Sequence, residues 1–154
     1  HSYILEVYMA ANNKIITNLG ADLMKFAFTD EDGDTFAYFR MNPADIKLYD
    51  RLRSVDKKVE AISAQYKDQE STGELTLELN NAIEDVFCYI LGYDVRESLF
   101  GFMSATAILA DGEPFYMRVL DIMTAAVGKE VEKRSKKMAK NIEKYTEKYA
   151  NEPV

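Results

Sequence analysis

The sequence has no tryptophan, and its 154 residues include one cysteine, one histidine and three prolines. The single cysteine, Cys88, excludes an intrachain disulfide. The histidine is His1, and a histidine at the first position is more typical of an added residue than of a ligand. Without it the chain has no imidazole, which is the commonest general base and metal ligand in proteins. These shortages remove most catalytic pairs and transition-metal sites from consideration.

Long apolar runs are also missing, because none approaches the roughly 20 residues of a transmembrane helix. The first residues show no basic segment followed by an apolar stretch and a small-residue cleavage site, so no signal peptide is expected. Together with the low cysteine content, this predicts a cytosolic protein. The apolar content of 47% is too high for a disordered chain. The length suits one domain with its own core.

Charge is distributed unevenly along the chain. The formal net charge is −7, which argues against general nucleic-acid binding by the whole domain. Residues 129–148 carry eight basic and four acidic side chains, a net of +4, so the rest of the chain carries −11. Several glutamates there lie three or four positions from a lysine, which is typical of a solvated, salt-bridged helix. The expected pairs are Glu130 with Lys133, Glu132 with Lys136, Glu143 with Lys140 and Lys144, and Glu147 with Lys144.

Residues 22–41 predict a β-hairpin, because aromatic side chains alternate with period two on both sides of the acidic segment 30–35. Asp32-Gly33 is a strong signal for a type I′ turn, which needs positive φ at both central residues. One apolar face then contains the pairs Phe28 with Ala37, Phe26 with Phe39 and Met24 with Met41. We expect that face to pack on helices. Before the hairpin, residues 3–9 and Ile15–Ile16 are candidate short strands.

Helical periodicity follows the hairpin. Asn42 suits an N-cap and Pro43 the first helical position, and apolar residues recur from Ile46 to Tyr66, so one helix of about six turns is expected. Further helices are expected over 74–91 with Gly92 as the C-terminal cap, over 95–100 with Asp94 as the N-cap, and over 114–149.

The predicted fold class is therefore α+β, mainly α. A β-hairpin (22–41) packs on a helical body (43–128), and a charged helical extension (129–149) completes a single domain spanning 1–154.

No residue set suggests catalysis or metal binding. The acidic segment 30–34 begins like a calcium loop, but its glycine falls at the fourth position and Met41 stands where a bidentate glutamate is needed. Glu84 and Asp85 have no base or phosphate loop beside them and are expected on a solvent-exposed helix face. Cys88 has no histidine partner and is expected to be a buried small side chain. We therefore predict no catalytic residue, no metal and no cofactor, and a protein that is not an enzyme.

Residues 99–109 are apolar but lack helical periodicity. They are either a buried connection under the helices or an apolar docking surface, on which methionine and phenylalanine adapt to a partner. The second face of the hairpin is another candidate surface. The candidate partner-binding residues are Phe36, Tyr38, Leu99, Phe100, Phe102, Met103, Ile108 and Leu109.

Several short motifs occur in a fixed order over residues 22–149. They are FAFTDEDGD from Phe26, FRMNPAD from Phe39, ILGYD from Ile90, LFG from Leu99, the Asp111-Gly112 turn, and EKYTEKY ending at Tyr149. In this layout the chain resembles the tail assembly chaperones of long-tailed bacteriophages and prophages of Gram-positive hosts. The resemblance provides no catalytic residue and no fixed binding motif to transfer.

The resemblance implies a protein of the host cytoplasm that binds the tape-measure protein during tail assembly. It would keep that long, aggregation-prone helical chain soluble until tail-tube subunits replace it. It also implies self-association, absence from the mature virion and a frameshifted longer form, with no membrane partner and no cofactor. The alternative hypothesis is a phage or prophage DNA-associated regulator that uses the basic helix 129–148.

Overall fold

The computed structural model describes residues 8–9 and 14–150, and His1 and most of the predicted strand 3–9 lie outside these ranges. The elements are β1 (Tyr8–Met9), β2 (Ile15–Ile16), η1 (Gly20–Asp22), β3 (Met24–Thr29), β4 (Thr35–Met41), α1 (Ile46–Arg53), α2 (Val55–Tyr66), α3 (Gly73–Leu91), α4 (Arg96–Phe100) and α5 (Phe115–Ala150). The predicted class is confirmed: the chain is mainly helical, with a small antiparallel hairpin and a long C-terminal helix. No helix within the described residues combines the length and apolar content that crossing a bilayer requires.

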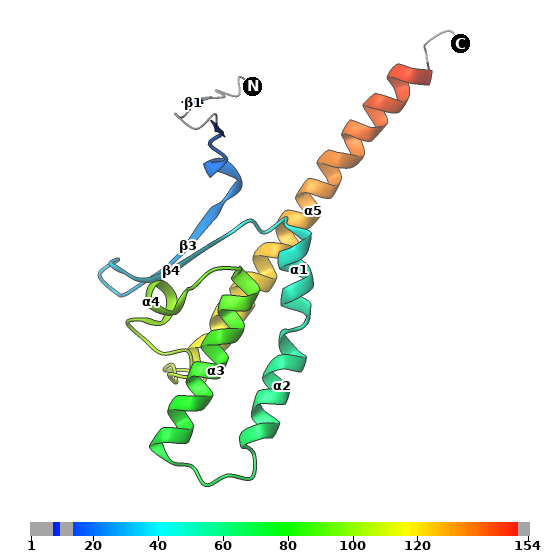
Figure 1. Cartoon of the computed structure of the whole chain (residues 1–154). Helices are drawn as coiled ribbons and strands as arrows, with labels where there is room; N and C mark the ends of the chain where they lie inside the picture. Colours follow the sequence, from blue (N-terminus) through cyan, green and yellow to red (C-terminus); the bar gives the residue numbers. More distant parts are fainter. Residues whose placement is uncertain (1–7, 10–13, 151–154) are drawn as a thin grey trace.

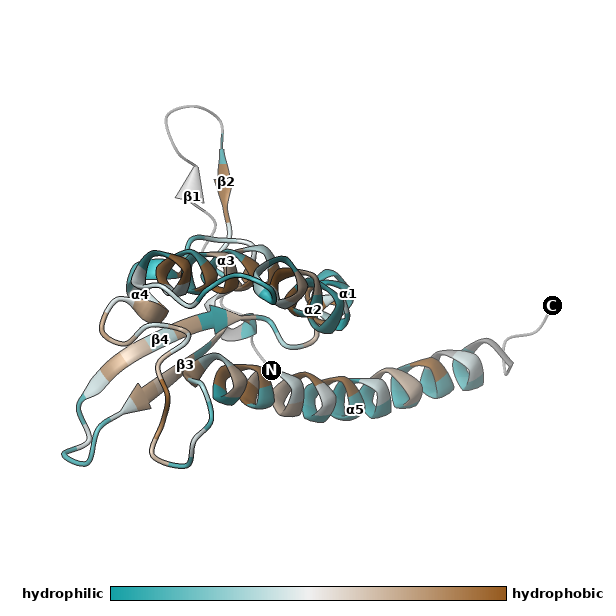
Figure 2. Ribbon diagram, turned by 90° about the horizontal axis from the view of Figure 1, so that it is seen from below, coloured by the Kyte–Doolittle hydropathy of each residue, from teal (hydrophilic) through white to brown (hydrophobic). Residues whose placement is uncertain are grey.

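The helices form a layer over the hairpin. Helices α2 and α3 lie side by side and run in opposite directions, joined by a loop at one end of the molecule (Figure 1). Seen from below, α1–α4 lie on one side of β3–β4, and the first half of α5 lies beside the hairpin (Figure 2). The second half of α5 extends past every other element, so the molecule has a body and an arm.

The hairpin has the predicted strand pairing but a different turn. Met24 pairs with Met41, Phe26 with Phe39 and Phe28 with Ala37, as expected. The register then shifts, so that Thr29 pairs with Thr35. Asp30 accepts a backbone hydrogen bond from Gly33, which has φ of 84°. These features define a three-residue loop with its glycine in the left-handed region, so the predicted two-residue type I′ turn is wrong.

The predicted six-turn helix is two helices. It begins later than expected, because Asp45 and not Asn42 is the N-cap, with its carboxylate accepting from the backbone N–H of Lys47 at 3.0 Å. The path breaks at Ser54, whose ψ of −6° departs from helical geometry and whose hydroxyl donates to the carbonyl of Arg51 at 2.7 Å. A serine that bonds to the preceding turn is a recognised cause of helix bending.

The other helices follow the sequence prediction closely. Helix α3 ends at Gly92, whose φ of 78° gives the left-handed cap that only glycine adopts readily. The predicted N-cap of α4 is wrong by one residue, because the N-cap is Val95, which makes no side-chain cap hydrogen bond. Asp94 lies one position earlier and accepts a hydrogen bond from the backbone N–H of Arg96 at 3.1 Å.

All eight phenylalanines of the chain belong to one connected aromatic network. Phe115, at the start of α5, joins its parts: its ring centroid lies 5.3 Å from that of Phe28 in β3 and 5.9 Å from that of Phe100 in α4. Phe87 continues the network into α3, 5.3 Å from Phe100. The network therefore holds the hairpin, the helix layer and α5 together.

Candidate functional site

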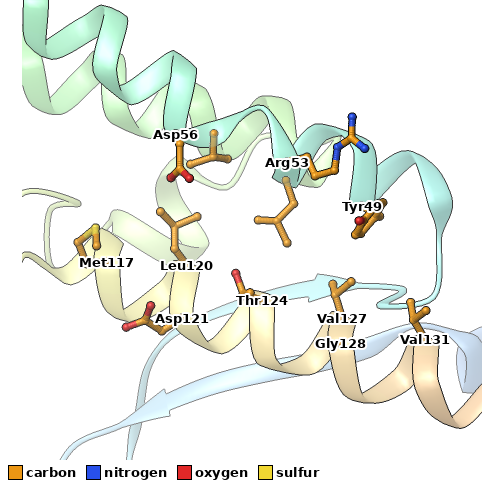
Figure 3. A pocket seen from close by; sticks show the side chains of 12 residues that line it. Tyr49, Arg53, Asp56, Met117, Leu120, Asp121, Thr124, Val127, Gly128 and Val131 are labelled. Carbon is orange, nitrogen blue, oxygen red and sulfur yellow. The ribbon is translucent and has the colours of Figure 1, made fainter.

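An open groove of about 530 Å³ lies between the α1–α2 segment and α5 (Figure 3). One wall comes from the end of α1 and the start of α2, and the other from the first half of α5. The lining residues are Tyr49, Leu52, Arg53, Val55, Asp56, Met117, Leu120, Asp121, Thr124, Val127, Gly128 and Val131. The two walls are apolar at their centres, and the charged side chains Arg53, Asp56 and Asp121 are the exceptions.

Two local features lie in the walls of the groove. The break at Ser54 lies between Arg53 and Val55, so it falls within the wall formed by α1–α2. On the opposite wall Gly128 carries no side chain, and no atom outside its own helix backbone lies within 4 Å of the place a Cβ would take. The groove is therefore a space between α5 and α1–α2 that side chains leave unfilled.

The wall formed by α5 continues beyond the body as an apolar stripe. Residues three, four, seven and eleven positions apart share a helix face, which places Met138 and Ile142 in line with Val131. Both are 59% exposed. Apolar residues recur along α5 past the body (Figure 2). From Met117 to Ile142 this stripe spans about 38 Å at 1.5 Å per residue.

Charged side chains border the stripe on the arm. Glu130 pairs with Arg134 at 3.3 Å, not with Lys133 as predicted, while the predicted pair of Glu132 with Lys136 forms at 3.3 Å. In the part of the chain that the structure describes, the remaining basic side chains of the arm make no ion pair; they are Lys129, Lys133, Lys137, Lys140, Lys144 and Lys148. The arm therefore presents an uncompensated positive charge.

The predicted docking segment 99–109 is divided between core and surface. Leu99 and Phe100 are buried, so they belong to the core, and this part of the predicted partner surface is corrected. They are buried because α4 lies against β4 and turns them inward. Met103 and Leu109 are half-buried against the same core.

Three predicted residues remain on or near the surface around the hairpin. Phe102 is 80% exposed, and its ring centroid lies 5.6 Å from that of the half-buried Phe36. The register shift brings Phe36 within 6.3 Å of Phe115, so it is not on a separate hairpin face as expected. The ammonium nitrogen of Lys25 lies 4.4 Å from the ring centroid of Tyr38. Ile108 is exposed as well, in the loop before α5.

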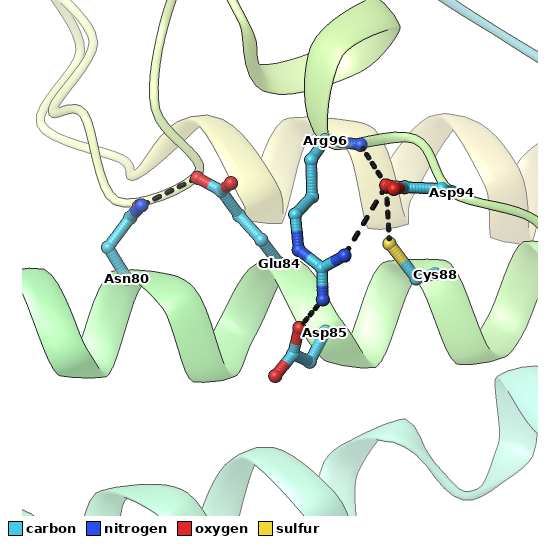
Figure 4. A network of polar contacts seen from close by, with 6 residues as sticks. All are labelled: Asn80, Glu84, Asp85, Cys88, Asp94 and Arg96. Atoms are coloured by element: carbon cyan, nitrogen blue, oxygen red, sulfur yellow. Dashed lines mark hydrogen bonds and ion pairs between the residues drawn. The ribbon is translucent and has the colours of Figure 1, made fainter.

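A buried polar pair ties α3 to the following loop (Figure 4). The amide of Asn80 donates to the carboxylate of Glu84 at 2.5 Å and accepts from the backbone N–H and hydroxyl of Thr106 at 3.0 and 2.9 Å. Ala105 donates its N–H to Glu84 at 3.4 Å. Glu84 is therefore buried and structural, and its predicted position on an exposed face is wrong. In the sequence, Glu84 directly follows the core residue Ile83 and lies three positions before the core residue Phe87, and this position indicates burial.

A second, exposed network fixes the turn before α4 (Figure 4). The backbone hydrogen bond from Arg96 is the main cause that lowers the pKa of Asp94, and the hydrogen bond to Asp85 raises the pKa of Arg96. Cys88 is half-buried with its Sγ 3.6 Å from Asp94, so it is not the fully buried side chain that was predicted. All of these contacts stabilise the turn before α4.

No group of three potential metal ligands occurs among the described residues. At the acidic hairpin tip, the side chain of Asp30 accepts the backbone N–H groups of Asp32 and Asp34 at 2.9 and 3.0 Å. Its carboxylate is therefore engaged in shaping the turn.

Comparison with protein-family models, with curated proteins and with solved structures found no significant match.

Proposed function

We propose that the chain is a non-catalytic tail assembly chaperone of a long-tailed phage or prophage, which binds the tape-measure protein during tail assembly. The observation that carries the proposal is the open apolar groove between α1–α2 and α5, continuous with the exposed stripe on the arm. Helix-in-groove binding uses such a surface, in which an amphipathic helix places its apolar face against exposed apolar side chains. A tape-measure protein is a long helical chain, and the order of motifs along this sequence supports that choice of partner.

The proposal includes the place of action. The protein works in the cytoplasm of the bacterial host and is absent from the finished virion. It also self-associates, and the exposed Phe102 beside Phe36 is the apolar pair outside the groove that favours contact with another copy.

Co-expression with the tape-measure protein encoded by the same phage tests the proposal. We expect the tape-measure protein to move from the pellet to the soluble fraction and to co-elute with this chain on gel filtration. The variant Leu120→Asp places a charge in the groove wall and should reduce co-elution of the tape-measure protein with this chain. Unchanged solubility of the tape-measure protein and separate elution would refute the proposal.

The alternative function, a DNA-associated regulator, is favoured by one observation: six lysines of the arm make no ion pair with another described residue. Titration of duplex DNA at several salt concentrations tests it, because contacts to phosphates produce a steep fall of affinity with salt. Binding at low salt with that dependence would favour this alternative, and no binding at low salt would remove it.

A further inference from the structure

The outer edge of strand β3 is open to solvent. Strand β4 pairs with one edge of β3, and helix α4 packs on β4, on the other side of the hairpin from the outer edge. Along that outer edge Lys25, Ala27 and Thr29 are exposed. Their backbone groups make no hydrogen bond with any described residue beyond the hairpin. A free strand edge of this kind is a template for the addition of another strand.

Two hydrogen bonds show which backbone groups of β3 point outward. The backbone N–H of Arg40 donates to the hydroxyl of Tyr93 at 2.7 Å, so it points away from its cross-strand partner Lys25. Residues 25 and 40 therefore form a pair whose N–H and C=O groups point away from each other. At the tip, the N–H of Asp30 points inward and donates to the carbonyl of Asp34 at 3.0 Å. Because the direction alternates along a strand, the outward groups belong to Lys25, Ala27 and Thr29.

We infer that the outer edge of β3 is the interface at which a second copy of this chain pairs antiparallel, about a two-fold axis at Ala27. The inference rests on the self-association within the proposed function and gives it a surface and a register. Ala27 of each copy lies opposite Ala27 of the other, and Lys25 lies opposite Thr29. Every outward N–H and C=O group of these three residues then has a backbone partner. The two hairpins become one continuous antiparallel sheet.

The apolar face of β3 supports this register. Phe26 and Phe28 are half-buried, and Met24 beside them is 38% exposed. In the paired sheet Phe26 of each copy lies opposite Phe28 of the other, at the closely spaced positions without hydrogen bonds. Aromatic cross-strand pairs stabilise antiparallel sheets. A second copy therefore covers the part of each ring that its own chain leaves exposed.

Charge favours a second copy in the antiparallel direction. The hairpin tip, residues 30–34, carries four acidic side chains and no basic one. The opposite end, residues 22–25 and 40–41, carries Lys25 and Arg40 with Asp22, a net of +1. Antiparallel pairing places the tip of each copy beside the basic end of the other, whereas parallel pairing would place the two acidic tips together. The hairpin therefore supplies the charge complement that its own edge requires.

Cysteine cross-linking tests the register, because the chain has only one native cysteine. In a Cys88→Ser background, Ala27→Cys places two thiols at the two-fold axis, where the Cα atoms of a hydrogen-bonded pair lie about 5.5 Å apart. We expect mild oxidation to give a covalent dimer on a non-reducing gel. Thr35→Cys is the matched control, because it is exposed on β4, the far strand of the hairpin. Equal cross-linking of the two variants would show random collision and overturn the interface.

Matched lysine substitutions test the contact without a covalent bond. Ala27→Lys places two like charges opposite each other at the axis, whereas Thr35→Lys makes the same change in net charge on β4. We expect sedimentation equilibrium to show that the first raises the dimer dissociation constant about tenfold or more, and that the second changes it by less than about threefold. Circular dichroism checks that both variants keep the fold. Equal effects of the two, or an unmodified chain that is a monomer at every concentration, would overturn the inference.

The outcomes also separate the inference from the function on which it rests. If the chain is a dimer that Phe102→Ser dissociates and that Ala27→Cys does not cross-link, the copies meet through Phe102 and Phe36. Self-association then stands and the β3 interface is refuted. If Ala27→Cys cross-links as expected while the tape-measure protein stays insoluble on co-expression, the β3 interface stands and the tail assembly function is refuted.

Discussion

Phe115 connects three parts of the aromatic network and is only 2% exposed. We expect Phe115→Ala to lower the free energy of unfolding by about 3–5 kcal/mol, because it removes a buried ring and leaves a cavity. Urea denaturation followed by circular dichroism measures this change. Phe102→Ala is the matched control at the exposed end of the network and should cost less than about 1 kcal/mol. Similar losses in both variants would contradict the central role of Phe115.

Two glycines predict stability changes of opposite sign. Gly33 has φ of 84°, so Gly33→Ala should destabilise by about 1–2 kcal/mol, and Gly33→Asn by less, because asparagine tolerates this region better. Gly128 lies within α5 with open space around it, so Gly128→Ala should stabilise by about 0.5–1 kcal/mol. Thermal unfolding of the three variants measures these changes. A gain of stability in Gly33→Ala would contradict the turn described above.

Single residues explain where sequence reasoning succeeded and failed. Alternation fixed which side chains of the hairpin share a face, and the observed pairs from Met24 to Phe28 agree with it. The turn was mispredicted because the carboxylate of Asp30 accepts two backbone N–H groups and stabilises a longer loop, which no dipeptide rule anticipates. Glu84 was misplaced because a buried carboxylate depends on Asn80 and on Ala105, which lies 21 positions away in sequence.

At the scale of elements, two aspartates stabilise in the same way the turns that precede α4 and α5. Asp94 accepts from the backbone N–H of Arg96 before α4, and Asp111 accepts from that of Glu113 before α5. These backbone hydrogen bonds are the main cause that lowers the pKa of each carboxyl below its ordinary value of 3.8. The native state therefore favours the carboxylate form at both positions.

This arrangement predicts the direction of a pH effect. A carboxyl group whose pKa is lowered in the folded state stabilises the protein at pH values above its ordinary pKa. That contribution is lost as the pH falls through the folded-state pKa. We expect the urea midpoint to decline below about pH 4, and the decline to be shallower in the Asp94→Asn, Asp111→Asn variant, whose amides accept the same hydrogen bonds without titrating. The same decline in both proteins would contradict this assignment.

The helix elements were largely predictable, but their joints were not. Apolar spacing identified the helical stretch from Ile46 to Tyr66 correctly, yet gave no sign of the break at Ser54, because serine is tolerated inside helices. The groove was missed for a related reason. Its walls come from residues 49–56 and 117–131, and periodicity shows that a face is apolar without showing that packing leaves part of it open.

At the scale of the whole molecule, the body and the arm should be separable in stability. The described side chains beyond Arg134 are exposed, so a chain that ends at Ser135 loses few packing contacts. We expect its free energy of unfolding to lie within about 0.5 kcal/mol of the full chain, measured by urea denaturation. A large loss would show that the arm supports the fold. The proposed binding of the tape-measure protein should be weakened, since Met138 and Ile142, the exposed end of the apolar stripe, are removed.

The length of α5 beyond its anchoring at Phe115 has a mechanical consequence. Its 36 residues extend about 54 Å, so the helix is a lever with its pivot in the aromatic network. A tilt of about 5°, which is a small adjustment of the groove width, displaces the far end by about 5 Å. A spectroscopic label near the end of the arm would therefore report occupation of a groove tens of ångströms away.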